Sequence, residues 1–190
     1  NNTYDGNDGD GFSVQQTTDG GYVIVGGHRD VFVIKTDSKG NEEWNKSYGG
    51  DSGDVGKFIQ QTKDGGFIII GNTYSFGNGD WDFWLIKTDS QGNEEWNKTF
   101  GGSNRDVVLG GGQQTTDGGY IITGGTRSFG YSGTDSNLWL IKTDSQGTEE
   151  WSRSYGKSSP DVGLSVQQTI DGGFIVTGFT QSYGSGSFDV

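Results

Sequence analysis

The chain of 190 residues is long enough for one domain, and its lack of cysteine excludes disulfide bonds, zinc–thiolate sites and thiol catalysis. The formal net charge of −12, from 25 acidic and 13 basic residues, disfavours nucleic acids and anionic membrane surfaces as partners. No apolar run approaches the roughly 18 residues of a membrane-spanning helix, so we expect no membrane insertion. The absence of methionine predicts a processed chain or a segment of a longer one, and an exported origin is compatible with the composition.

The first stretch of the chain, taken in order, predicts four β-strands at residues 12–17, 21–27, 31–37 and 42–48. Thr-Asp-Gly-Gly between the first two predicts a tight hairpin, because Asp and Gly tolerate positive φ. Asp-Ser-Lys-Gly-Asn between the last two predicts a longer hairpin loop that contains glycine.

This four-strand unit recurs with a period of about 50 residues, a length typical of propeller blades. Lys-Thr-Asp begins at Lys35, Lys87 and Lys142, and Gln-Gln-Thr also recurs. Asp-Gly-Gly begins at four positions separated by 45, 53 and 54 residues: Asp19, Asp64, Asp117 and Asp171.

The polarity of the strands indicates how the units assemble. The second and third strands are continuous apolar runs, such as residues 67–70, 83–86 and 138–141, which predicts burial on both faces. The first and fourth strands mix polar and apolar residues. We therefore predict an all-β fold: a single β-propeller, or part of one, with four-stranded antiparallel blades, the Gln-Gln strand beside a central channel and the fourth strand on the outer rim. The predicted blades are 1–48, 49–100 and 101–155, followed by a partial blade at 156–190.

Trp44, Trp96 and Trp151 share one register of the fourth strand, where each indole is expected to be buried at a joint between blades. The surrounding sequence segment, "DSKGNEEWNKSYGG" and its copies, resembles the tryptophan-docking repeats of quinoprotein-like propellers. The whole unit resembles the repeats of uncharacterised secreted or lipid-anchored bacterial and archaeal propellers. That resemblance implies the fold and a secreted or cell-surface location, and it implies no agreed activity.

Both ends of the sequence fall inside a repeat. Residues 1–4 align with residues 45–48, and residues 188–190 align with residues 81–83. Two interpretations follow: the chain is a segment of a longer array, or its termini close a small ring or pair head-to-tail with a neighbouring molecule through open strand edges.

The loops between the second and third strands are expected to share one face with the loops that join successive blades. They are rich in aromatic, Gly, Ser and Asp residues, a mixture that suits glycan or peptide binding on a rigid rim. The alternative is that the repeated rings only pack the blades together. The ligand-binding candidates are Phe76, Trp81, Phe129, Tyr131, Tyr183 and Phe188.

Three aspartates, Asp54, Asp106 and Asp161, begin first strands after Gly-rich turns. A ring of carboxylates on one rim would bind a cation, which leaves Ca²⁺ as a candidate cofactor. The alternative, which the local sequence favours, is that each carboxylate accepts backbone N–H bonds in its own turn. The stretch "DGNDGDG" at 5–11 fails the spacing of an EF-hand loop.

Asn1, Asn45 and Asn97 each begin a glycosylation sequon on the predicted outer strand, and the third blade has lost it, with Ser152 in place of asparagine. Because repeats copy one another, the three sequons are not independent signals.

His28 is the only histidine and no serine signature lies beside it, so we interpret it as a surface turn residue and assign no catalytic residues. The sequence therefore favours a non-catalytic extracellular or cell-surface module that binds a glycan or a protein. The first alternative is a structural subunit of a filament, sheath or surface layer, and the second is a hydrolase or lyase acting at the channel mouth.

Overall fold

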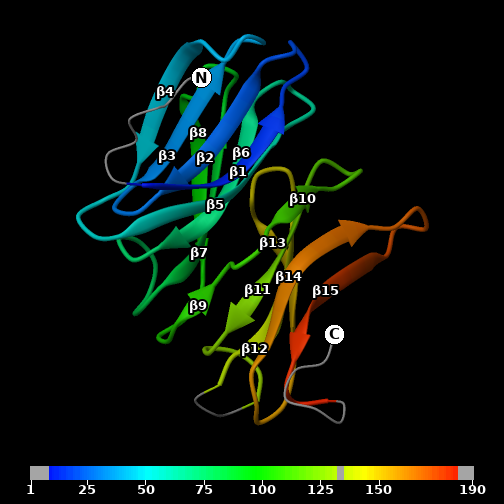
Figure 1. The fold of residues 1–190 in the computed structure, drawn as a ribbon. Helices are drawn as coiled ribbons and strands as arrows, with labels where there is room; N and C mark the ends of the chain where they lie inside the picture. The colour runs from blue at the N-terminus through cyan, green and yellow to red at the C-terminus, as the bar shows by residue number, and fades with distance from the viewer. Residues whose placement is uncertain (1–8, 132–134, 184–190) are drawn as a thin grey trace.

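The computed structural model describes residues 9–131 and 135–183, and within these residues the chain is all-β, with no helix. The strands form antiparallel sheets in which each strand pairs with its neighbour in sequence, apart from one short additional strand (Figure 1). The predictions for residues 1–8 and 184–190, including Asn1 and Phe188, concern residues outside the described part of the chain.

Two four-stranded sheets, one five-stranded sheet and one hairpin follow one another along the chain. The first sheet contains β1 (Asp10–Gln16), β2 (Tyr22–Gly27), β3 (Val31–Thr36) and β4 (Glu42–Tyr48). The second sheet contains β5 (Asp54–Gln61), β6 (Phe67–Thr73), β7 (Asp82–Thr88) and β8 (Glu94–Phe100). The third sheet contains β10 (Gly112–Gln114), β11 (Tyr120–Thr126), β12 (Asn137–Thr143) and β13 (Glu149–Tyr155), with β9 (Asp106–Val107) also paired to β11. The C-terminal hairpin contains β14 (Asp161–Gln168) and β15 (Phe174–Thr180). The four strands predicted for the first repeat are thus confirmed to within two residues.

The Asp-Gly-Gly motif forms the turn between the first two strands of each unit, as predicted. In the first sheet the Asp19 carboxylate accepts bonds from the Thr17 hydroxyl and from the Gly21 N–H, and Gly20 adopts a φ of 86°. Only glycine takes this left-handed conformation without strain. The other three copies repeat these bonds and this φ.

In the three sheets, though not in the C-terminal hairpin, a lysine with three partners connects this turn to the third and fourth strands. The Lys87 side chain is 5% exposed, and its ammonium group lies 3.0 Å from both the Asp64 and the Glu95 carboxylates and donates to the Thr88 carbonyl. Lys35 and Lys142 make the same contacts in their own sheets. The recurring Lys-Thr-Asp motif is therefore a structural ion-pair site, since a buried charge needs partners for all of its donors.

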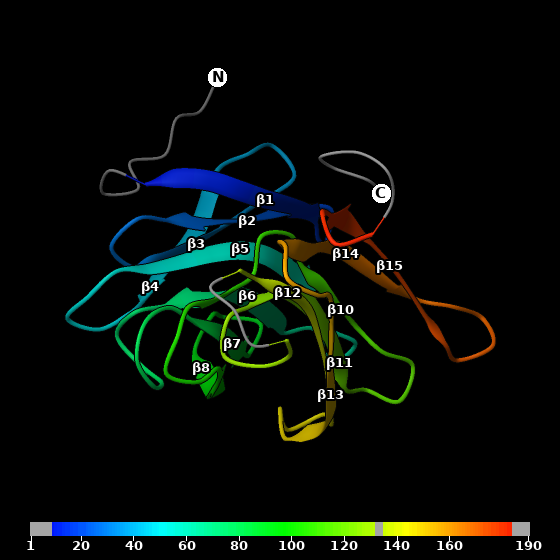
Figure 2. The same ribbon diagram turned by 90° about the horizontal axis from the view of Figure 1, so that it is seen from below.

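The sheets pack face to face in chain order, so that the apolar second and third strands of one meet those of the next (Figure 2). One core lies between the first and second sheets, where Val25 and Val33 meet Ile69 and Trp84. The other cores lie between the second and third sheets and between the third sheet and the C-terminal hairpin. Each sheet buries its apolar faces only against its neighbours.

The tryptophans of the fourth strands reach across each of these joints. Trp44 meets Phe67 of the second sheet edge-on, with ring centroids 5.8 Å apart, and it also lies over Gly92, where a Cβ atom would come within 2.8 Å of the indole. Trp96 packs in the same way against Tyr120 and over Gly147, and Trp151 packs against Phe174. The indoles are half-buried rather than buried, because the fourth strand is the outer edge of its sheet.

The paired glutamines of the first strands connect the sheets to one another. The side-chain carbonyl of Gln15 accepts from the Gln61 backbone N–H at 2.6 Å, and Gln60 accepts from Gln114 at 2.8 Å. Gln113 accepts from Gln168 at 3.0 Å at the last joint. From the second sheet onward, the first strand therefore donates a backbone N–H bond to a glutamine side chain on the first strand of the preceding sheet.

Two sequence expectations are corrected by the packing. The first strand of the third sheet is split into β9 and β10, because residues 108–111 leave the ladder where Gly110 and Gly111 lie against Leu164 and Phe58. Strands β2 and β15 are not covered on both faces: alternate side chains such as Tyr22 and Ile175 are exposed, because no described sheet lies beyond them.

Candidate functional site

One face of the molecule gathers the loops between second and third strands together with the loops that join successive sheets. The backbone N–H of Tyr74 donates to the Gly53 carbonyl, and that of Asp54 donates to the Arg29 carbonyl in the first sheet. Ser52 also donates to the Ser75 hydroxyl. The predicted sharing of one face by these two kinds of loop is confirmed by these contacts.

The three aspartates considered as cation ligands are the anchors of these loops. Asp54 is buried, and its carboxylate accepts from the Thr73 hydroxyl, from the Ser75 hydroxyl at 2.7 Å and from the Gly50 N–H at 2.9 Å. Asp106 accepts from Thr126, Gly102 and Arg127, and Asp161 accepts from Thr180, Ser182 and Lys157. These bonds favour the turn-anchoring interpretation, and within residues 9–131 and 135–183 no three His, Cys, Asp or Glu residues are arranged to hold a metal.

A second polar residue lies beside each anchor, at the start of the third strand, and it is Asp30, Asp82 or Asn137. In the second sheet, the carboxylates of Asp82 and Asp106 both lie beside Gly101, where a Cβ atom would contact an oxygen of each. Asp82 Oδ2 accepts from the Asn78 N–H at 2.6 Å, whereas Oδ1 is buried without a hydrogen-bond partner. Burial raises the pKa of Asp82 to about 6, and the nearby negative charges of Asp106 and Asp80 act in the same direction.

The aromatic candidates on this face differ in how firmly they are held. Phe76 packs on Trp84 with centroids 5.2 Å apart, and Phe129 packs on Trp139 at 5.0 Å. These two rings are 43% and 44% exposed, so each has a buried base and a free outer surface. The repeated rings therefore pack the sheets and are also presented to solvent.

The other candidates extend the same face. Trp81 is half-buried, meets Tyr74 edge-on at 5.7 Å and covers Gly53 in the preceding loop. Tyr131 is 59% exposed, and Tyr183 is 51% exposed with the Lys157 ammonium group 4.4 Å from its ring centroid. His28 is an exposed loop residue here, in agreement with its interpretation as a surface turn.

The two described sequon asparagines lie on exposed outer strands, and both are already hydrogen-bonded. Asn45 Nδ2 donates to Glu42, and Asn97 Nδ2 donates to Glu94 at 2.6 Å. Asn97 Oδ1 also accepts from the Trp84 indole N–H at 3.2 Å. A glycan on Asn97 would have to displace a structural contact, because it would be attached through that amide nitrogen.

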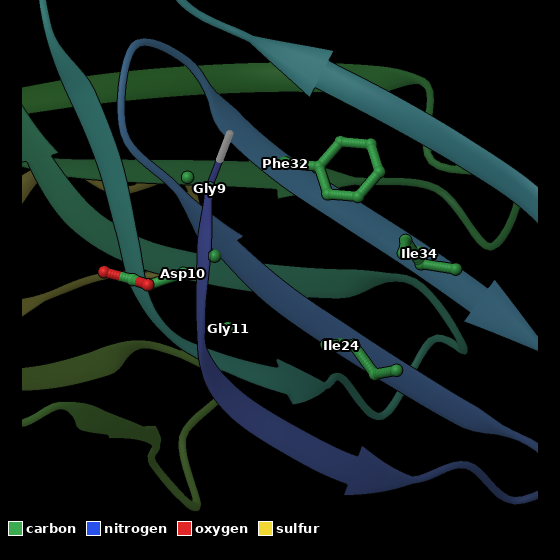
Figure 3. A pocket seen from close by; sticks show the side chains of 8 residues that line it. Gly9, Asp10, Gly11, Ile24, Phe32 and Ile34 are labelled. Carbon is green, nitrogen blue, oxygen red and sulfur yellow. The ribbon is translucent and has the colours of Figure 1, made fainter. Parts of the chain in front are cut away.

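The outer face of the first sheet is apolar and no described sheet lies over it, although Ile34 at its centre is only 3% exposed. Ile24, Phe32 and Ile34 project from β2 and β3 into a shallow cavity of about 170 Å³, which the backbone of residues 9–11 borders (Figure 3). Val14 and Tyr22 extend this face and are 65% and 37% exposed. We call this set of five residues the uncovered face.

A second cavity, of about 280 Å³, lies on the outer rim where the second and third sheets meet, and sequence reasoning missed it. It combines aromatic, hydroxyl and carboxylate groups. The signal that could have found it is the change from asparagine to Ser152, which was interpreted only as a lost sequon. Its lining comprises Thr99, Phe100, Gly101, Phe129, Trp139, Glu149 and Ser152.

No protein-family model matches the sequence, and no curated protein matches it. The fold is similar to a crystal structure of a protein of unknown function from Bacteroides caccae, with a TM-score of 0.56 and 14% sequence identity. The match covers 90% of this chain and 53% of that one, so this chain spans about half the length of the protein it resembles. At this identity the likeness concerns the fold alone. Within the described part of the chain, no helix is long and apolar enough to cross a membrane.

Proposed function

We propose that the chain is a non-catalytic binding module of propeller blades, secreted or displayed on a cell surface, that holds a glycan or a protein on its loop face. The observation that carries this proposal is the set of half-exposed rings, Phe76, Phe129 and Tyr183, each held at an equivalent place in successive repeats. Their loops are anchored by buried or half-buried carboxylates, so the rings are presented at little cost in conformational entropy.

The propeller arrangement is supported by the face-to-face stacking and by the glutamine contacts, which keep the first strands of successive sheets adjacent. Export is supported by the acidic, cysteine-free composition and by the resemblance of the repeat to those of secreted propellers. The propeller arrangement and export concern the architecture and the location of the protein. The proposal of a glycan or protein ligand depends on the rings of the loop face.

Binding to a glycan array and to a panel of cell-surface proteins tests the function. We expect wild-type protein to retain at least one ligand and the double variant Tyr131→Ala, Tyr183→Ala to lose most of that binding. Tyr22→Ala is the matched control, since Tyr22 is an exposed ring at the opposite end of its sheet. A wild-type protein that retains nothing, or a double variant that binds as the wild type does, would refute the loop-face proposal.

The uncovered face supports a second candidate function, as a structural subunit that assembles head-to-tail. Its residues occupy the same repeat positions as Ile59, Phe67, Ile69, Trp84 and Ile86, all of which are buried against the first sheet. A sheet from a second copy would cover it in the same way. Electron microscopy and sedimentation at rising concentration test this: assembly that Val14→Glu abolishes would support it, and a monomer at every concentration would rule it out.

A further inference from the structure

The rim cavity between the second and third sheets contains polar groups that have lost the partners their counterparts keep. In the second sheet, the Trp84 indole N–H donates to Asn97, and Asn97 in turn donates to Glu94. Ser152 takes the place of Asn97 in the third sheet, and its side chain is too short to bridge the same two groups.

The consequence is a set of unpaired groups that line one cavity. The Trp139 side chain is 3% exposed, yet its indole N–H has no hydrogen-bond partner among residues 9–131 and 135–183. The exposed side chains of Glu149 and Ser152 and the half-buried Thr99 hydroxyl also line the cavity, and within the same residues none of them has a hydrogen-bond partner in the protein. The indole nitrogen opens onto the cavity, so an acceptor on a bound molecule or a water can reach it.

The chemistry of these groups restricts the ligand. The indole offers a donor and the exposed Glu149 carboxylate offers an acceptor, and a ligand hydroxyl group can pair with either of them. A cationic ligand would satisfy Glu149 but could not accept from Trp139, and an anionic ligand would face Glu149 and a chain of net charge −12. The half-exposed ring of Phe129 and the half-buried ring of Phe100 add apolar walls for carbon–hydrogen faces.

We propose that this rim cavity binds a neutral polyhydroxylated ligand, a single sugar ring in size, which accepts from the Trp139 indole and donates to Glu149. The proposal goes beyond the proposed function, which places a glycan or a protein on the loop face. It adds a site that lies between outer strands and that depends on one residue, Ser152. A volume of about 280 Å³ is at the small end of the range for ligand pockets, which agrees with one ring rather than an extended chain.

Indole N–H signals in NMR spectra of ¹⁵N-labelled protein provide the test, because each of the six tryptophans gives one. Neutral monosaccharides and their methyl glycosides are titrated into the millimolar range, with choline and acetate as the charged probes. The Trp139 signal is identified by its absence in Trp139→Phe. If that variant does not fold, the signal is identified as the one that Ser152→Asn moves in the absence of ligand.

We expect at least one sugar to shift the Trp139 signal in a saturable manner, and Ser152→Asn to abolish that shift. Ser152→Asn should fold well, because it installs the arrangement that Asn97 already has in the second sheet. Asn97→Ser is the matched control: it leaves the Trp139 response intact and frees the Trp84 indole, which should then respond as well.

A sugar response that survives Ser152→Asn would overturn the proposal, as would a Trp139 signal that choline or acetate shifts while no sugar does. The two proposals fail separately. If Ser152→Asn still binds the glycan array and its Trp139 signal still shifts when sugar is added, the loop-face function stands and the rim site is refuted. If sugars shift the Trp139 signal but the array and the protein panel are blank, the rim site stands and the loop-face function falls.

Discussion

The first and second sheets have nearly the same sequence pattern and differ mainly in what covers them. Val14 is 65% exposed, whereas Ile59 at the same repeat position is 1% exposed. Tyr22 is 37% exposed, whereas its counterpart Phe67 is 1% exposed. The apolar pattern of a repeat therefore specifies two apolar faces on each sheet. The neighbouring sheets determine which of these faces is buried.

The largest expected effect comes from truncating matched rings on the two sheets. Phe67→Ala should destabilise the protein by about 3–5 kcal/mol, because it removes a fully buried ring at a joint that Trp44 also packs against. Tyr22→Ala should cost less than about 1 kcal/mol. Urea unfolding of both variants measures the difference. Equal losses would mean that the outer face of the first sheet is covered in solution.

The second prediction concerns the buried Asp82, whose counterpart in the third sheet is Asn137. The pKa of Asp82, raised to about 6 in the folded chain, lies above the ordinary value of 3.8. Ionisation of Asp82 therefore opposes folding: the contribution of this one group to stability is most favourable below about pH 4 and becomes less favourable as the pH rises toward 6. Asp82→Asn should stabilise the protein by about 1–3 kcal/mol at pH 7.

The gain from Asp82→Asn should largely disappear at pH 4, where the acid is protonated in the folded state and partly protonated in the unfolded state. The reciprocal variant Asn137→Asp should lose stability at pH 7 and recover part of it at pH 4. Thermal unfolding from pH 4 to pH 8 gives both curves. A stabilisation by Asp82→Asn that is independent of pH would show that the charge is not its cause.

The glutamine contacts provide a smaller, matched test of the joints. Gln60→Ala should cost about 1 kcal/mol, because the half-buried Gln114 N–H loses its acceptor. The side chain of Gln167, at the same repeat position in the C-terminal hairpin, has no hydrogen-bond partner among the described residues, and Gln167→Ala should have no measurable effect. Chemical denaturation of the two variants side by side measures this. A large loss in Gln167→Ala would reveal a partner beyond the hairpin.

The smallest expected effect separates a turn with a lysine partner from one without it. The Thr115 hydroxyl and then Lys142 lower the pKa of Asp117 to about 2, so its contribution is present above about pH 4 and is lost as the pH falls toward 2. Its carboxylate is 56% exposed, so Asp117→Asn should cost less than about 1 kcal/mol at pH 7.

Asp171 keeps the threonine and backbone bonds of the turn, but no lysine among the described residues pairs with it. Asp171→Asn is therefore the control for Asp117→Asn. The Thr169 hydroxyl also lowers the pKa of Asp171, so both variants should narrow their stability difference from wild type between pH 7 and pH 3, and Asp117→Asn should narrow it more because Lys142 adds to the effect. If the two variants behave alike, Lys142 contributes nothing through Asp117.

Much of the site depended on information that the sequence holds only in part. Asp54, Asp106 and Asp161 were visible as turn residues, since an aspartate after a Gly-rich turn has local acceptors. The rim cavity was not visible, because Thr99 and Glu149 come from different sheets and only packing brings them together. The lysines recur in three repeats, but their partners lie 8 residues away on the fourth strand and 16–25 residues away in the first turn, and neither spacing by itself indicates an ion pair.

The sequence by itself determined the strands, the turns and the antiparallel order, because alternation, Asp-Gly turns and strand length act within a single repeat. The tertiary structure decided which faces are buried, which rings stay exposed and where unpaired polar groups meet. These properties depend on neighbouring sheets. A face that is buried in one repeat and exposed in another has the same apolar pattern in both. Only a neighbouring sheet removes that face from water.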